Sequence, residues 1–303
     1  MNTIYADSSF SDEKRRQLLY QGQLFTYSNR PSIRALSDFA AQMIREAFGS
    51  LYPTTAQYHM PVEDFVKIFA PLKPKFIHHP ESKRLIQEIL KDFGCDLDET
   101  YEDVPRLRAV TSDGYLTSGV GYAHHLHRDT WYSAPHAQIN WWLPIFEMAA
   151  ESSMAFHPQY WTQRVRNGSS DFNYYEWNSS GRANAAQHIK ADTRKQPKPE
   201  QAMELDPQVR IVPEPGGVIL FSAAQMHSTV PNTSGRTRFS IDFRTVHLRD
   251  LRAKLGAPNL DSASTGTSLR DFVRAADLSP MPEDAVELYD QGGAREGVLV
   301  YRP

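Results

Sequence analysis

The chain has 303 residues, of which 40% are hydrophobic and 23% are charged, so it can bury a sizeable core in one large or two small domains. Its formal net charge of −3 disfavours a dedicated nucleic-acid binder, because that class carries a basic excess. No run of about 18 apolar residues predicts a membrane span, and the first residues lack the apolar core of a secretory signal. Cys95 is the single cysteine, which excludes an intrachain disulfide and a cysteine-built zinc site. We expect a cytoplasmic globular protein.

The N-terminal part, residues 1–104, is predicted to be mostly helical. In segment 33–48, apolar side chains recur at helical spacing, and Gly49 follows as a stop signal. These helices are typical packing elements, and we assign no chemistry to them. The expected helices are 11–20, 33–48, 61–71 and 81–93.

The pattern changes near residue 105 to short strand-like runs, most of them separated by turn residues. Many short strands without intervening helices are typical of a sandwich or small barrel. We therefore expect a mainly β fold with flanking helices, organised as one domain over 1–303 with its core at 105–248. The strand-like runs are 107–112, 116–126, 137–146, 209–212, 217–222 and 237–248.

Two segments do not fit the strand pattern. Residues 158–207 form a polar stretch with interspersed aromatic residues, and a stretch this long inside a compact domain is usually a functional lid or a disordered insert. We predict a lid that closes over bound substrate. Residues 249–303 are rich in Ala, Gly, Ser and Pro and predict a C-terminal extension with one short helix near 269–276.

The segment YAHHLHRD ends with the first candidate for chemistry, His127 and Asp129. Residues i and i+2 of a strand share a face, so both side chains can reach one point. An imidazole nitrogen and a carboxylate oxygen on one side are two of the three ligands that hold non-haem Fe(II) in a facial triad. The pair alone is a weak signal, because a histidine next to an aspartate is often only a surface hydrogen bond.

The third ligand must be a histidine distant in sequence, and His227 is the best candidate. It follows a Pro-Gly-Gly turn and the apolar run 218–221, which predicts a buried strand that ends near the site. His125 competes for the first position, because it shares the face of His127. Other histidines, less well placed for either position, are His124, His157, His188 and His247.

An arginine lies eleven residues after His227, at the start of an alternating strand. Arg238, Asp242 and Arg244 share one face of that strand, and an arginine there offers a planar, bidentate fork to a carboxylate. Arg236 and Arg244 compete with Arg238 for this role, but Arg236 is expected in the preceding turn.

These residues together resemble the Fe(II)- and 2-oxoglutarate-dependent oxygenases, and within them the phytanoyl-CoA dioxygenase-like group. The resemblance spans about 105–248 and includes the segment HSTVPNTSGRTR. It implies a double-stranded β-helix core, also called a jelly roll or cupin-like fold. It also implies that His127, Asp129 and His227 bind Fe(II), with O2 and 2-oxoglutarate as cosubstrates.

The same resemblance implies further roles for single positions. Arg238 would bind the distal carboxylate of 2-oxoglutarate, assisted by Thr229, and Trp142 would lie beside the cosubstrate. Gln138 and Asn140 share the strand face of Trp142, so they also are expected to line the cosubstrate pocket. Candidates for the substrate pocket are Trp131, Tyr132 and Arg244.

The expected reaction is the oxidation of a C–H bond of a small biosynthetic intermediate, with release of succinate and CO2. Because Asp129 is present, hydroxylation is favoured over halogenation, whose enzymes replace the carboxylate with a small residue. Desaturation and epoxidation stay open. The alternatives are a cupin-like metal protein without 2-oxoglutarate, acting as an isomerase or binding module, and a noncatalytic jelly-roll domain. Arg238 distinguishes the oxygenase from both alternatives, because neither alternative needs an arginine to bind the carboxylate of 2-oxoglutarate.

Overall fold

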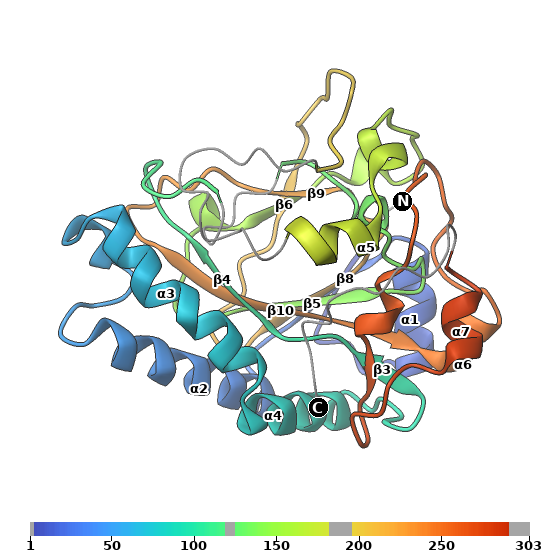
Figure 1. Cartoon of the computed structure of the whole chain (residues 1–303), viewed down its shortest axis with the longest axis horizontal. Coiled ribbons are helices and arrows are strands. Elements are labelled where there is room, and N and C mark those ends of the chain that lie inside the picture. The colour runs from blue at the N-terminus through green and yellow to red at the C-terminus, as the bar shows by residue number, and fades with distance from the viewer. Residues whose placement is uncertain (1–2, 119–124, 182–195, 291–303) are drawn as a thin grey trace.

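Two β-sheets face each other, and helices from the N-terminal part cover the outer face of the larger sheet (Figure 1). The computed structural model describes residues 3–118, 125–181 and 196–290, and the structural statements below concern these residues. None of their helices is long and apolar enough to cross a membrane.

Four helices make up most of the N-terminal part, as the apolar spacing predicts. The third is longer than expected, because it continues past Pro71 and through Pro74 instead of ending at residue 71. Each proline removes a backbone hydrogen bond, but the burial of Leu72, Phe76 and Ile77 beyond the first proline holds the last turns in place. The helices are α1 (Asp12–Tyr20), α2 (Pro31–Phe48), α3 (Val62–Ile77) and α4 (Pro80–Asp92).

The larger sheet has the strand order β1-β2-β8-β5-β10-β3-β11, with β4 also paired to β10. Two of its strands, the edge strand β1 and its neighbour β2, lie in the N-terminal part and were not expected from the sequence, since each has only three or four residues. The strands are β1 (Ile4–Ala6), β2 (Leu24–Tyr27), β3 (Thr100–Glu102), β4 (Arg106–Val110), β5 (Ile139–Pro144), β8 (Val218–Ser222), β10 (Arg238–His247) and β11 (Val273–Arg274).

The smaller sheet has the order β7-β6-β9, and an isolated bridge between His127 and His227 extends it beyond β9. The two sheets pack face to face, because Phe156 of β6 and Phe221 of β8 meet with ring centroids 5.0 Å apart. This pairing of β4, β10, β5 and β8 opposite the smaller sheet confirms the expected jelly roll. The smaller-sheet strands are β6 (Met154–Phe156), β7 (Val209–Arg210) and β9 (His227–Thr229).

Two secondary-structure predictions were wrong. The described part of the expected strand 116–126 contains no strand, because residues 112–118 form turns and bends; residues 119–124 lie outside the described part. The short helix expected near 269–276 is instead a 3-10 turn, Ser268–Asp271, followed by β11. The apolar residues of segment 269–276 fit a strand as well as a helix, and pairing of β11 with β3 supplies the backbone hydrogen bonds.

The described parts of the polar insert pack against the jelly roll. The short helix α5 (Tyr174–Glu176) contributes two buried tyrosines to a small aromatic cluster with Phe172, and Tyr132 packs against it. Residues 182–195 lie outside the described part, so the lid role remains a prediction. Beyond β10, the chain adds α6 (Leu248–Arg252) and α7 (Glu283–Glu287), which contact each other beside the sheet.

Candidate metal centre

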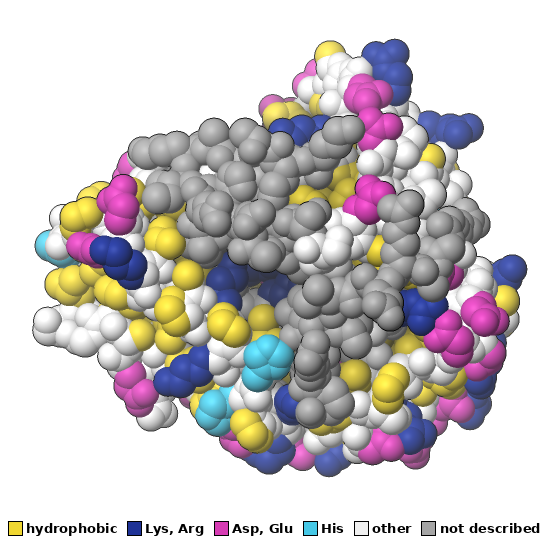
Figure 2. Space-filling view, in the orientation of Figure 1, with side chains coloured by type: hydrophobic (Ala, Val, Ile, Leu, Met, Phe, Trp, Pro, Cys, Tyr) yellow, Lys and Arg dark blue, Asp and Glu magenta, His cyan; other side chains and the backbone are white. Residues whose placement is uncertain are grey.

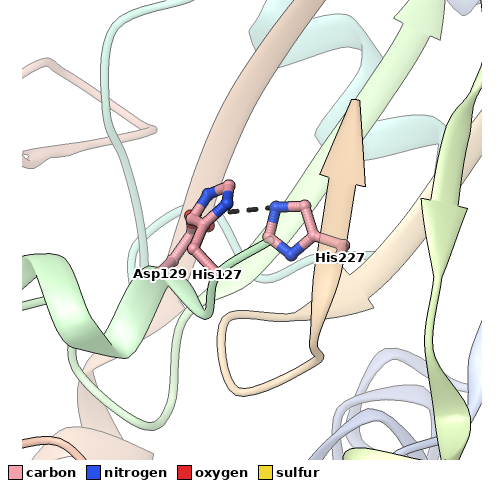
Figure 3. A group of neighbouring side chains, drawn as sticks. All are labelled: His127, Asp129 and His227. Carbon is pink, nitrogen blue, oxygen red and sulfur yellow. Dashed lines mark ion pairs between the residues drawn. The ribbon is translucent and has the colours of Figure 1, made fainter. Parts of the chain in front are cut away.

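His127, Asp129 and His227 converge at one point between the two sheets (Figure 3). One potential ligand atom from each lies within 4.8 Å of the others. His127 Nε2 is 3.4 Å from Asp129 Oδ1, and His227 Nε2 is 4.0 Å from the same oxygen. Three nitrogen and oxygen donors that meet on one side of a common point match the facial arrangement typical of non-haem Fe(II).

The backbone brings the two histidines together. His127 and His227 form a two-way bridge, in which each N–H donates to the other's carbonyl at 3.0 Å. Asp129 does not lie on a strand, although its spacing from His127 predicted one; it begins the 3-10 helix Asp129–Tyr132. The side chains of Asp129 and His127 still point to the same side. Arg128 between them has an extended backbone (φ −111°, ψ 141°), and in extended backbone residues i and i+2 share a side.

Hydrogen bonds to backbone carbonyls orient both imidazole rings. His127 Nδ1 donates to the carbonyl of His125 at 2.8 Å, and His227 Nδ1 donates to the carbonyl of Gln225 at 2.9 Å. A carbonyl only accepts, so each Nδ1 carries the proton and each Nε2 keeps its lone pair. This is the tautomer that a histidine needs to bind a metal through Nε2.

The charge states also suit a cation. Burial lowers the pKa of His227 to about 4, with help from the charge of His127 and against the opposing effect of Asp129, so its ring is neutral at neutral pH. Burial alone would raise the pKa of Asp129. Interactions with His127, His227 and Arg244 outweigh burial and hold that pKa well below its ordinary value. A carboxylate and neutral imidazole nitrogens are a donor set that fits Fe(II).

Gln138 and Asn140 lie against the metal-site carboxylate. Asn140 Nδ2 donates to Asp129 Oδ2 at 2.6 Å, and Gln138 Nε2 approaches that oxygen at 3.5 Å and donates to Asn140 Oδ1 at 2.9 Å. These contacts leave Oδ1 of Asp129 directed at the two histidines. The amides therefore orient a candidate ligand, while their direct contact with 2-oxoglutarate remains a prediction.

Arg238 and Trp142 lie together on the inner face of the larger sheet. The guanidinium carbon is 5.2 Å from the centre of the Trp142 ring, and Nη1 donates to the carbonyl of Ser152 at 2.8 Å. Thr229 stands on β9, two residues after His227, and is partly buried. Arg236, the rival clamp, is exposed in the turn before β10. The carboxylate-binding role of Arg238 remains a prediction.

The candidates for the substrate pocket differ in accessibility. Trp131 is fully buried, and its indole N–H donates to Asp261 at 2.7 Å, so a direct contact with substrate is unfavourable. Tyr132 is partly buried, with its ring centre 5.5 Å from that of His127. Arg244 lies on the inner face of β10 and donates to Asp103 at 3.0 Å.

The described rival histidines are engaged elsewhere. His125 Nε2 is 2.7 Å from the carbonyl of Pro197, and His157 bonds to Ser228 and to the carbonyl of Leu205. His247 is an odd number of residues from Arg238 on β10 and thus faces the opposite side of the sheet. The remaining rivals, His124 and His188, lie outside the described residues.

Several polar residues around the site were missed from the sequence. Arg128 lies between two candidate ligands in the sequence, but no residue pattern there indicates what its side chain contacts. Its partner, Asp261, lies in the segment that was predicted to be a C-terminal extension. Charged side chains of β4 also face the interior. Their alternation with Leu107 and Ala109 in the run Arg106–Val110 was the available signal.

The jelly-roll fold and the buried His, Asp, His donor set are those of the non-haem Fe(II)- and 2-oxoglutarate-dependent oxygenases. More than half of the chain, residues 34–240, matches the model of the phytanoyl-CoA dioxygenase (PhyH) family. The chain therefore belongs to the phytanoyl-CoA dioxygenase family, and Fe(II) and 2-oxoglutarate are its cofactor and cosubstrate.

Similar solved structures include the non-heme monooxygenase ThoJ in its apo form (12% identity, TM-score 0.40, 73% of this chain and 71% of that chain). EvdO2 from Micromonospora carbonacea var. aurantiaca is another (11% identity, TM-score 0.43, 79% and 92%). A third is the carbocyclase SnoK from nogalamycin biosynthesis (11% identity, TM-score 0.41, 79% and 85%). These likenesses are too weak to carry an argument, and the assignment rests on the family match. No curated protein sequence is significantly similar to the chain.

Proposed function

We propose that the chain hydroxylates an unactivated C–H bond of a small biosynthetic intermediate, and that His127, Asp129 and His227 hold the Fe(II). The observation that carries this proposal is the convergence of the two Nε2 atoms on Oδ1 of Asp129. When bound, Fe(II) supplies the oxidising chemistry: the substrate, O2 and 2-oxoglutarate give the alcohol, succinate and CO2. The carboxylate ligand favours hydroxylation over halogenation.

The protein's own contribution is to bind and orient the two organic molecules. Arg238, 3% exposed and stacked on Trp142, offers a charged fork to the distal carboxylate of 2-oxoglutarate, with the hydroxyl of Thr229 as a second donor. Gln138 and Asn140 fix the rotamer of Asp129. The smaller sheet covers the other side of the site, where the ring of Phe156 lies 6.4 Å from that of His227.

A cluster of charged side chains on the same inner face supports an anionic substrate. Arg108 binds Asp242 through two nitrogen–oxygen contacts of 2.6 and 3.2 Å, and Arg244 bonds to Asp103. Among the described residues, the cluster joins three arginines to two aspartates. Its members are Asp103, Arg106, Arg108, Asp242 and Arg244.

This arginine cluster lies beside the metal centre. Arg244 is paired in register with Asn140, which bonds to Asp129, and the charge of Arg244 helps to lower the pKa of that carboxyl. Figure 2 shows basic side chains near the middle of this face, over β4 and β10. Buried ion pairs contribute little net stability, so recognition of a carboxylate or phosphate group on the substrate explains the cluster better.

The test is an anaerobic titration of the purified protein with Fe(II) and then 2-oxoglutarate, followed by the visible charge-transfer band of their complex. We expect the wild type to develop the band and, after exposure to O2, to release succinate. His127→Ala and His227→Ala should lose both signals, whereas His78→Ala, an exposed histidine at the end of α3, should keep them. A band of normal strength in either ligand variant would disprove the proposed metal site.

A further inference from the structure

We propose that Arg128 and Asp261 form a buried clamp that positions the metal ligands, which makes the segment around Asp261 part of the metal centre. The proposal rests on the proposed function, because it assumes that His127, Asp129 and His227 bind the metal. Neither Arg128 nor Asp261 touches the reacting atoms, so both are positioning residues.

The side chain of Arg128 leaves the ligand face and enters the protein. It is 2% exposed, because the extended backbone at Arg128 points it away from the side shared by His127 and Asp129. Its Nη1 donates to the carbonyl of Ala224, and its Nη2 donates to the carbonyls of Tyr160 and Gln163. One guanidinium therefore bonds to the loop before His227 and to the start of the polar insert.

Asp261 completes this arrangement from the C-terminal segment. Its carboxylate, with a side chain 5% exposed, accepts from Arg128 Nε at 3.3 Å, from Trp131 Nε1 at 2.7 Å and from the backbone N–H of Val165 at 3.0 Å. Both oxygens are thus in use. The pair neutralises two charges that would be costly to bury singly.

The neighbours of Asp261 hold the helix that begins with Asp129. Ser262 Oγ donates to the carbonyl of Thr130, and Ser264 Oγ donates to the same carbonyl at 3.1 Å. Ser133, just past this helix, donates to the carbonyl of Thr265 at 2.8 Å. Residues 261–265 therefore bind the Asp129–Tyr132 helix at its start, middle and end.

The clamp acts on both sides of the ligand set. Ala224 lies three residues before His227, and Trp131 lies two residues after Asp129, so a shift of the Arg128–Asp261 pair would move both ligand segments. Groups that orient ligands from behind typically change metal affinity about 10- to 100-fold when removed. If the ion pair only stabilised the fold, its removal would lower the melting temperature and leave the metal affinity of the folded protein unchanged.

The experiment measures Mn(II) binding to the full chain by calorimetry and by electron paramagnetic resonance, without turnover. Asp261→Asn keeps the shape but removes the charge, and Arg128→Lys keeps the charge but removes the fork. We expect each to weaken Mn(II) binding about 10- to 100-fold and to broaden the spectrum. Asp284→Asn, which breaks an exposed ion pair with Arg252, is the matched control and should change neither.

A milder variant guards against loss of folding. Trp131→Phe removes one hydrogen bond to Asp261 and keeps the packing, so we expect a folded protein with about two- to tenfold weaker Mn(II) binding. Wild-type affinity in the folded Asp261→Asn, Arg128→Lys and Trp131→Phe proteins would overturn the clamp. Failure of the wild type itself to bind Mn(II) would instead overturn the proposed metal site and the clamp with it.

Discussion

The two faces of the larger sheet differ sharply, although the same strands build both. On β10, Phe239, Ile241 and Phe243 point outward into the apolar core under the N-terminal helices. Their neighbours Arg238 and Arg244 point inward, toward the smaller sheet and the metal centre. Because side chains alternate along a strand, stability and chemistry are separated by a single residue step. Substitutions on the two faces should therefore have different consequences.

The largest effect is expected at the metal centre. Asp129→Ala removes a ligand of the proposed Fe(II) site, so succinate release and product formation should both fall below detection, while the fold is retained because the outer face is untouched. Mass spectrometry of product and succinate measures the change. Hydroxylation at a near-normal rate in this variant would show that Asp129 is not a ligand.

On the outward face of β10 we expect the opposite pattern, in which stability falls and ligand binding is kept. Phe239→Ala leaves a cavity among Phe69, Phe146 and neighbouring rings and should lower the free energy of unfolding by about 3–5 kcal/mol. The folded fraction should bind Fe(II) and 2-oxoglutarate as the wild type does. Urea unfolding combined with ligand titration checks this, and a specific loss of 2-oxoglutarate affinity would contradict the separation of faces.

Arg238→Ala tests the adjacent inward residue. A buried carboxylate that loses its charged partner costs about 2–5 kcal/mol, so the dissociation constant for 2-oxoglutarate should rise steeply while Fe(II) binding persists. Arg236→Ala is the matched control, because Arg236 is exposed in the turn two residues earlier. If the control weakens 2-oxoglutarate binding and Arg238→Ala does not, the carboxylate-binding role has been assigned to the wrong arginine.

Arg244→Gln reduces the net charge of the arginine cluster without emptying the space. Once a substrate is found by a metabolite screen for the gain of one oxygen, this variant should lower its kcat/KM about 10- to 100-fold. The affinity for 2-oxoglutarate should stay within about twofold, since Arg238 is unchanged. A preferred substrate with no negative group would exclude the proposed role of the cluster.

The smallest effect concerns Glu102 on β3. Burial, reinforced by the charge of Asp103 and opposed by Lys83, raises the pKa of this carboxyl well above its usual 4.5. The folded state holds a proton that the unfolded state releases, so stability present below the unfolded pKa is lost as pH rises through the folded pKa. Glu102→Gln should therefore gain stability relative to wild type as pH rises above the unfolded pKa of about 4.5. If the free energies of unfolding of the two proteins changed with pH in parallel, Glu102 would not have a raised pKa.

The outer face and the candidate metal ligands could be predicted from the sequence for different reasons. Helical spacing and strand alternation reveal apolar faces directly, which explains the success with α2, α4, β5 and β10. His127, Asp129 and His227 were chosen as candidate ligands because their residue types carry chemistry, and the structure brings them together. Asp129 was placed on a strand in error, since local sequence does not report that a 3-10 turn begins there.

Long-range polar contacts were beyond the sequence. Nothing near Asp261 indicates a partner 133 residues away, and the extension assigned to residues 249–303 in fact contributes β11 to the larger sheet. Strands β1 and β2 were missed because β2 pairs with β8, which lies far along the chain, and β1 pairs only with β2. Similarly, Trp131 suggested a pocket residue, but its indole N–H is used within the core.

The most direct test of the proposed metal site is a crystal structure of the protein with Mn(II) and 2-oxoglutarate, with anomalous diffraction to locate the metal. We predict one strong peak at about 2.0–2.2 Å from His127 Nε2, Asp129 Oδ1 and His227 Nε2. 2-Oxoglutarate should chelate the metal and extend its distal carboxylate to Arg238. A metal bound elsewhere, or one bound without these three side chains, would show that they do not form the Fe(II) site.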